Sequence, residues 1–158
     1  MQQAIQAATA AVQGLTGGNI GAAIAGGAAP YIANVIGHQT GLNSAGKVMA
    51  HAVVNAALAA AQGKSGAGAA AGAAMGELTG MLASEIYGKK PDEMSETEKQ
   101  TVSALATLAA GLSGGLVGGN SQEAISSAQA GKVVVENNYL GATNSTKPSR
   151  KSNRAINL

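Results

Sequence analysis

Residues 68–88 read GAAAGAAMGELTGMLASEIYG. Glycine recurs every four residues from Gly68 to Gly80, and Ser84 and Gly88 continue the series. Residues four apart lie on one face of an α-helix, so this stretch predicts a helix with a strip of very small residues, which another backbone can approach closely. We favour tight packing between the helices of a water-soluble domain. The alternative interpretation is a glycine zipper that inserts into a membrane.

The composition supports close packing throughout the chain. Among 158 residues there are 23 Gly and three Tyr, and Phe, Trp and Cys do not occur. The length is typical of one domain, and its core must be built from Ala, Val, Ile, Leu and Met. Without cysteine, the chain cannot form a disulfide, a thiolate nucleophile or a cysteine metal site.

The charges are unevenly distributed, although the net charge is only +2. Residues 1–46 and 100–122 carry no Asp, Glu, Lys or Arg, whereas seven of the residues 89–99 are charged. The uncharged runs are long enough to span a membrane, but they are rich in Ala and Gly, which are nearly neutral on transfer scales. We therefore expect a soluble domain. The sequence after Met1 has neither the basic start nor the apolar block of a secretory signal peptide.

The sequence predicts an all-α domain of five or six short helices over residues 1–140. A disordered basic tail is expected over residues 141–158, which are rich in Asn, Ser, Thr, Lys and Arg. The expected helices cover about residues 2–13, 19–36, 45–62, 66–87, 95–113 and 121–136.

Local signals set the expected helix ends. Ser95 and Glu98 have the spacing of a capping box, and Asn43 or Ser44 can cap the helix that follows. Pro30 is expected to end or kink its helix. The pair Gly114–Gly115 is expected to stop the fifth helix.

Two apolar patterns complete the expected fold. Val102, Leu105, Leu108 and Leu112 form a single apolar stripe at helical spacing. The β-branched run 133–135 makes an extended ending of the last helix possible.

The sequence contains no recognisable enzyme site. His38 and His51 have no partner ligands nearby in the sequence, so we expect each to be a surface or hydrogen-bonded histidine and expect no metal site. The acids at 85–98 are expected to form a solvated loop and a helix cap. Neither a phosphate loop nor a basic patch with aromatics is present, so we expect no cofactor, small-molecule substrate or nucleic-acid partner.

Four elements follow one another in the second half of the chain: EKQTVSALATLAAGL (98–112), GGLVG (114–118), AQAGK (128–132) and VENNYL (135–140). Together they resemble the pretoxin domain with VENN motif of CdiA-type contact-dependent growth inhibition proteins, with the motif itself at Val135, Glu136, Asn137 and Asn138. Further likeness lies in the Ala/Gly-rich segments 51–56 and 72–77, and the resemblance covers roughly residues 15–140.

The resemblance implies a function in toxin delivery. In this family the module lies between a long secreted filamentous region and a variable C-terminal toxin, which is released at VENN and enters a neighbouring cell. It implies a secreted or cell-surface location and contact with the target-cell envelope. Only 20 residues follow Asn138, so residues 141–158 correspond to the start of a missing or truncated toxin, and we expect no toxin activity from this chain.

Asn138 is the candidate for chemistry at the junction. An Asn side-chain amide can attack its own backbone carbonyl and break the chain after itself, provided that the fold positions it. Glu136, or a histidine brought close by the fold, could assist the proton transfer. The alternative is that Asn137 and Asn138 merely end a helix. We therefore predict no conventional enzyme, only single-turnover self-cleavage, with a structural or membrane-interacting glycine-zipper protein as the competing hypothesis.

Overall fold

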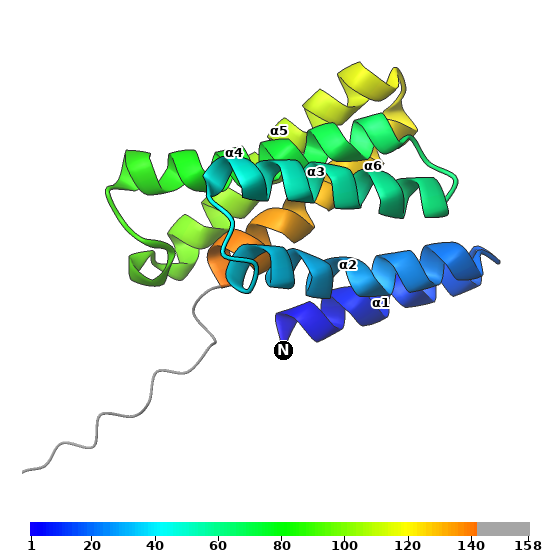
Figure 1. Ribbon diagram of the computed structural model, residues 1–158, viewed down its shortest axis with the longest axis horizontal. Helices are drawn as coiled ribbons and strands as arrows, with labels where there is room; N and C mark the ends of the chain where they lie inside the picture. The colour runs from blue at the N-terminus through cyan, green and yellow to red at the C-terminus, as the bar shows by residue number, and fades with distance from the viewer. Residues whose placement is uncertain (142–158) are drawn as a thin grey trace, which may run out of the picture.

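The computed structural model describes residues 1–141, and these form an all-α fold, as predicted (Figure 1). The expected tail over residues 141–158 lies outside the described residues, except for Gly141. The six α-helices are α1 (Gln2–Thr16), α2 (Ile20–His38), α3 (Ser44–Ala61), α4 (Gly66–Tyr87), α5 (Glu96–Gly118) and α6 (Ser121–Val134). Two short elements complete the fold, a 3-10 turn η1 (Pro91–Glu93) and a π-helical segment η2 (Val135–Tyr139).

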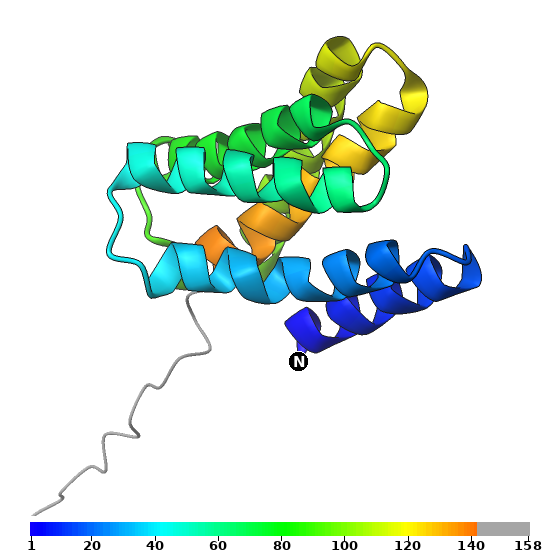
Figure 2. The ribbon, with the colours of Figure 1, turned by 45° about the vertical axis from the view of Figure 1, so that its right-hand side comes forward.

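Successive helices pair as hairpins, α1 with α2, α3 with α4, and α5 with α6. Helix α4 is the central element because it packs against α3, α5 and α6. Helix α1 packs mainly against α2, and this pair lies along one side of the molecule (Figure 2). The segment η2 contacts α2, α4, α5 and α6, so it lies where the hairpins meet.

Polar side chains at the helix starts account for most of the boundaries. Asn43 accepts a hydrogen bond from the Gly46 amide, and Ser95 and Glu98 form the predicted capping box. Gly88 ends α4 in the left-handed conformation, with φ 61°. These features are encoded by neighbouring residues, and the sequence predicted them correctly.

Three of the expected helix endings differ in the structure. Pro30 does not end α2: its ring is buried inside the fold and its carbonyl accepts a hydrogen bond from Gln3 at 2.8 Å. Gly14 does not end α1, which continues to Thr16. The last helix does not become extended at residues 133–135, because the chain remains helical through Tyr139.

The pair Gly114–Gly115 also does not stop α5, which continues to Gly118. Both glycines face α6, where Gly114 lies against Ser127 and Gly115 against Ala124. The stop is Gly119, which adopts the left-handed conformation with φ 76°. These two glycines are therefore packing residues and not helix terminators.

The glycine strip of α4 packs against α6 and η2. A Cβ added at Gly76 would lie 2.7 Å from the Gly131 Cα, and one added at Gly72 would lie 2.8 Å from the Ser127 Cβ. Such distances are shorter than van der Waals contact, so α4 and α6 approach each other backbone to backbone. This is the tight helix packing that the spacing of the glycines predicted.

The apolar stripe expected on α5 is wrong as a description of the buried face. Val102 is buried, but Leu105, Leu108 and Leu112 are 54%, 64% and 70% exposed. The buried positions are Val102, Ala106, Ala110 and Gly114, spaced by four residues. Because α5 approaches α4 and α6 so closely, only the smallest side chains fit between them.

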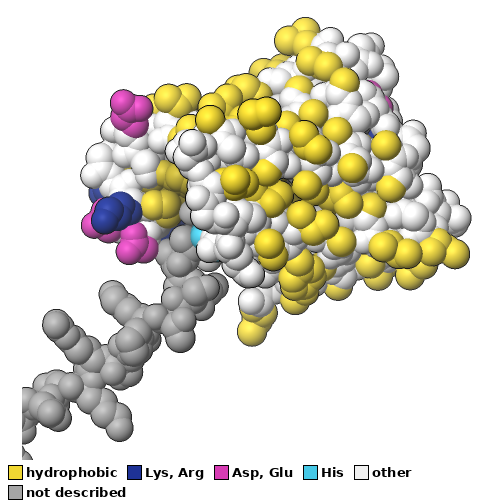
Figure 3. Space-filling view, in the orientation of Figure 1, with side chains coloured by type: hydrophobic (Ala, Val, Ile, Leu, Met, Phe, Trp, Pro, Cys, Tyr) yellow, Lys and Arg dark blue, Asp and Glu magenta, His cyan; other side chains and the backbone are white. Residues whose placement is uncertain are grey.

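Large apolar side chains consequently remain on the surface. In Figure 3 apolar side chains are spread over the visible face, whereas charged ones gather at one end. Helices α2 and α5 are each long and apolar enough to cross a membrane by length and composition, with mean hydropathies of 1.4 and 1.5. No more than a third of either hydropathy window is buried in the fold.

Candidate functional site

The VENN motif lies in the π-helical segment η2, at the end of α6. The amide of Leu140 donates to the carbonyl of Val135, which closes the wide turn. Single π-helical turns are rare and occur frequently at functional sites. The motif is therefore part of the folded domain, held between helices that are distant in sequence.

Asn138 is buried at the centre of this site. Only 4% of its surface is exposed, and its Nδ2 donates a hydrogen bond to the Glu77 Oε2 of α4. On its other side the amide lies against Gly37 of α2, where a Cβ would overlap the Asn138 side chain. The side-chain amide of the residue predicted to react is thus fixed from two directions.

Behind Glu77 lies His51 of α3. The His51 Nε2 is 3.5 Å from the same Glu77 Oε2 that binds Asn138. His51 is fully buried, and within residues 1–141 neither of its ring nitrogens has a hydrogen-bond partner. The expectation of a surface or hydrogen-bonded histidine holds for the exposed His38 but is wrong for His51.

Burial shifts the titration of both groups. Burial and, to a smaller extent, the positive charge of Lys47 together lower the pKa of His51 to about 4. Burial raises the pKa of the Glu77 carboxyl, opposed by the hydrogen bond from Asn138 and by the charge of Lys47. At neutral pH His51 is therefore a neutral imidazole beside an acid whose proton affinity has been increased.

Glu136, the other candidate, has a different set of partners. It accepts hydrogen bonds from Gln2 and Gln6 of α1 and from Ser103 of α5, and it pairs with Lys132 at 3.7 Å. These contacts tie α1 and α5 to the VENN segment. The hydrogen bonds bring Asn138 together with Glu77, not with Glu136.

Asn137 and Tyr139 fix the backbone on either side of the candidate residue. Asn137 donates to the Gln6 side chain at 2.7 Å and to the Val133 carbonyl at 2.8 Å. The Tyr139 hydroxyl donates to Ser84, and its ring lies over Gly80. The Asn138–Tyr139 peptide bond is therefore held on both sides.

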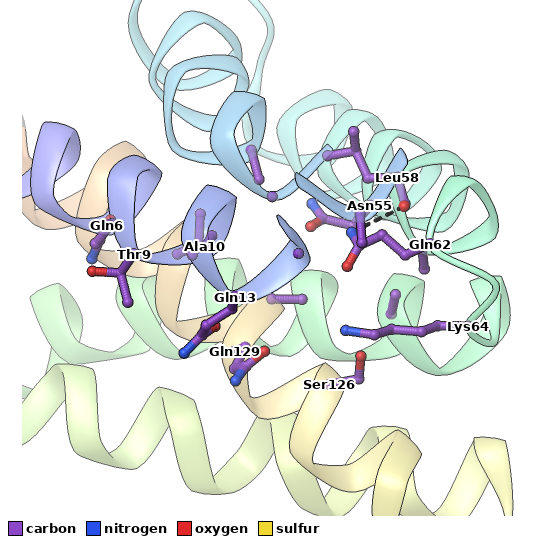
Figure 4. A pocket seen from close by; sticks show the side chains of 18 of the residues that line it. Gln6, Thr9, Ala10, Gln13, Asn55, Leu58, Gln62, Lys64, Ser126 and Gln129 are labelled. Carbon is purple, nitrogen blue, oxygen red and sulfur yellow. Dashed lines mark hydrogen bonds between the residues drawn. The ribbon is translucent and has the colours of Figure 1, made fainter. Parts of the chain in front are cut away.

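Two hollows lie near the motif without containing Asn138. One, of about 530 Å³, lies between α1, α2, α3, α4 and α6, and its lining includes the amides of Gln6, Gln13 and Gln129 (Figure 4). The other, of about 860 Å³, is lined by Ser103, Glu136 and Leu140, among others. The Gln6 side chain borders the first hollow and also binds Asn137.

Within residues 1–141 no three His, Asp or Glu side chains gather closely enough to hold a metal ion.

The sequence predicts a reactive role for Asn138, but it gives no indication that Glu77 and His51 are its neighbours. Glu77 lies 61 residues before Asn138, inside the glycine strip, where a lone acid gives no local signal. One indication was available: an acid on the packed face of a helix is rarely fully buried without a partner. The acids at 85–98 include Glu98, which is partly exposed and caps the start of α5 by accepting a hydrogen bond from the Ser95 amide.

Comparisons with known proteins agree with the resemblance at the motif. Residues 91–142 match the family described as pre-toxin domain with VENN motif. Residues of this chain are 57% identical over 56 residues to a tRNA nuclease CdiA of Escherichia coli O6:K15:H31 (strain 536 / UPEC), and 61% identical over 54 residues to a toxin CdiA of Yersinia pestis. Each match covers 34% of this chain and 2% of the relative.

A longer match covers nearly all of the chain. The chain is 48% identical over 149 residues to a tRNA nuclease CdiA of Escherichia coli (strain STEC_O31). This match covers 93% of the chain and 4% of the relative. The chain thus corresponds to a small part of the curated relatives that it matches. No solved structure matches this chain. Taken with the motif held inside a helical fold, these matches show that the chain carries the CdiA-type pre-toxin domain with VENN motif.

Proposed function

We propose that this domain is the release module of a CdiA-type toxin, in which the polypeptide breaks after Asn138. The observation that carries the proposal is the fixed position of the Asn138 amide, which is buried and bound to Glu77. Asn138 is the last residue of the sequence VENN, and it lies within the residues that match the pre-toxin family, which supports the proposal. Asn138 is a better candidate than Asn144, Asn153 or Asn157, which lie outside the described residues and outside the family match.

The surroundings of the bond favour a reaction within the chain over cleavage by a separate protease. Proteolysis concentrates in exposed and flexible segments. Here Val135, Asn137 and Asn138 are buried, and the segment is helical. An external protease would have to unfold the junction first, whereas an intramolecular reaction needs only the groups already in contact.

The proposed reaction is cyclisation of Asn138. Its Nδ2 attacks the carbonyl carbon of the same residue, a carbon–nitrogen bond forms, and the bond to the Tyr139 nitrogen breaks. One product ends in a succinimide at Asn138, and the other begins with the free amine of Tyr139. An amide is a poor nucleophile, so its positioning supplies much of the rate. The domain reacts once and is consumed, and it is not a turnover enzyme.

The biological role follows from the place of such a domain in a longer protein. We propose that the module connects an N-terminal filamentous region, secreted or displayed at the cell surface, to a C-terminal toxin. Breaking the chain after Asn138 frees the toxin for delivery into a neighbouring cell. The curated relatives are named as toxins or nucleases, which is consistent with a toxin as the released part.

The proposal is tested by substitution in a protein that carries a C-terminal toxin or a folded carrier. Asn138→Ala removes the nucleophile and should abolish release, whereas Asn144→Ala, Asn153→Ala and Asn157→Ala should leave the rate unchanged. Each protein is purified, incubated and followed by gel electrophoresis and circular dichroism. Unchanged release in a folded Asn138→Ala protein would show that the motif is not self-cleaving.

A second candidate function is contact with a membrane, favoured by one specific observation. Helix α5 exposes Leu105, Leu108, Leu112 and Leu116, the last at 85%, within a run that lacks charged residues. Flotation with neutral and anionic lipid vesicles tests it. Binding that is lost on replacing these leucines with Gln would support it, and recovery of all the protein in the unbound fraction would exclude it.

A further inference from the structure

The strongest unexplained feature of the fold is the buried pair His51 and Glu77. Both side chains are almost completely inaccessible, at 0% and 3% exposure, in a core built largely from alanine and glycine. Burying an ionisable group is unfavourable unless the group is well paired. In the part of the chain that the structure describes, neither ring nitrogen of His51 has a hydrogen-bond partner. Packing alone would be served better by an apolar side chain at each position.

The contact that Glu77 does make is with the candidate nucleophile. Its Oε2 accepts the hydrogen bond from Asn138 Nδ2, the atom that attacks in the proposed cyclisation. Among the described residues, the Asn138 side chain contacts the ionisable group of Glu77 on one side and the backbone at Gly37 on the other. A group within hydrogen-bond reach of the proton to be removed satisfies the first requirement for a general base.

Cyclisation needs one proton to move and none to be supplied. The Nδ2 atom must lose a proton as its bond to the carbonyl carbon forms. The Tyr139 nitrogen must gain a proton as its bond to that carbon breaks. A single carboxylate that accepts the first proton and returns it to the leaving nitrogen balances the reaction without any co-reactant.

We propose that Glu77 is this general base and then the general acid for cleavage after Asn138, and that His51 is a positioning residue behind it. The inference rests on the function proposed above. In this proposal the neutral imidazole of His51 carries its proton on Nε2, 3.5 Å from Glu77 Oε2, so the positive end of the N–H dipole lies near the carboxylate and favours its ionised form. Lys47 of α3, which binds the Gly37 carbonyl at 2.6 Å, adds a positive charge nearby.

The protonation states fit these roles. Burial raises the pKa of Glu77, so its carboxylate is a stronger base than an exposed glutamate. For the same reason the carboxyl group loses its proton at a higher pH than an exposed glutamate does. The groups that act on it are His51 and Lys47, both from α3, and the Asn138 amide of η2. Cleavage should therefore slow as the pH falls and Glu77 becomes protonated.

The decisive variant is Glu77→Gln in the full chain with a C-terminal carrier. Glutamine keeps the size and the acceptor oxygen for Asn138 but cannot take up the proton, so the cleavage rate should fall about 100-fold or more. Glu123→Gln is the matched control, because Glu123 is also buried and binds the Ser65 amide, away from the junction. Its rate should stay within about twofold of the unmodified protein.

The pH profile separates a chemical role from a structural one. The unmodified protein should show a rate that declines toward acid while its circular dichroism is unchanged, and any residual rate of Glu77→Gln should lack this decline. His51→Leu should shift the decline to higher pH without abolishing cleavage. If Glu77→Gln does not fold, the pH dependence of cleavage by the unmodified protein tests the proposal. A cleavage rate that does not change with pH would overturn it.

The two proposals fail in different ways. If Asn138→Ala stops cleavage but folded Glu77→Gln cleaves at the normal rate, the release function stands and the role of Glu77 is wrong. If Asn138→Ala cleaves normally, both proposals are wrong.

Discussion

Gly37 of α2 lies directly against the side-chain amide of Asn138, although the two residues are far apart in sequence. A Cβ at position 37 would overlap the Asn138 side chain and lie 3.0 Å from its Cα. Glycine at this position is therefore what allows α2 to cover the VENN segment. The contact couples the packing of the first hairpin to the position of the candidate nucleophile.

Gly37→Ala should disturb the junction more than its small size suggests. Overpacking at a buried contact should lower the free energy of unfolding by about 1–3 kcal/mol. Displacing the Asn138 amide should also slow release. Urea unfolding and the cleavage rate measure the two effects. A Gly37→Ala variant that is as stable as the parent and cleaves at the same rate would show that the contact with Gly37 does not hold the Asn138 amide in place.

Gly76→Ala tests the close crossing of α4 and α6. The new methyl group would lie 2.7 Å from the Gly131 Cα, so the variant should lose about 1–3 kcal/mol despite the better helix propensity of alanine.

Gly27→Ala is the matched control for that crossing. It also lies within a helix, but its nearest neighbours would be 3.7 Å from the new Cβ. It should be neutral or stabilising by up to about 1 kcal/mol. Similar thermal midpoints for the two variants would refute close packing at Gly76.

Helix α5 offers a direct test of which residues form its buried face. Val102→Ala removes a buried side chain and should cost roughly 1–3 kcal/mol, as other large-to-small core substitutions do. Leu108, which is 64% exposed, should tolerate replacement by Ala to within about 0.5 kcal/mol. If Leu108→Ala lowered the denaturant midpoint more than Val102→Ala does, the leucine stripe would be the packed face.

Much of the fold is predictable from the sequence because its signals are local. The caps at Asn43 and Ser95 and the left-handed Gly88 involve residues within a few positions of one another. The exposed leucines of α5 were misinterpreted because hydrophobic periodicity assumes that large side chains fill the core. In this chain the core is narrow, and Ala106 and Ala110 occupy it.

The site was only partly predictable, for a related reason. Asn138 could be identified because the VENN motif is contiguous. Glu77 and His51 reach it from α4 and α3, and their meeting depends on how the hairpins pack, which no spacing in the sequence specifies. The continuation of α2 past Pro30 is not predictable from the sequence either, because the burial of its ring and the Gln3 contact are tertiary features.

Stability should depend on pH through His51. The folded protein binds a proton on His51 only near pH 4, whereas the unfolded chain binds it near the ordinary 6.5. The unfolded state therefore holds more protons between these values, and acidification should remove roughly 3 kcal/mol of stability across this window. Above the window His51 contributes no pH dependence.

Glu77 acts in the opposite direction. Its pKa is raised in the fold, so the native state keeps this proton longer and gains stability on acidification below that pKa. Comparing urea unfolding of His51→Leu and the parent isolates the histidine: the variant should lose less stability between neutral pH and pH 4. The exposed His38→Gln is the control and should follow the parent. Identical curves for His51→Leu and the parent would contradict a buried neutral imidazole.

The mass of the cleavage products tests the central claim most directly. The chain is purified with a folded carrier after residue 158, incubated at neutral pH and measured by intact-mass spectrometry. The account predicts one fragment that ends at Asn138 and is one water lighter than the free acid, and a second that begins at Tyr139. A protein that stays intact while folded, or one that breaks at another bond, would contradict it.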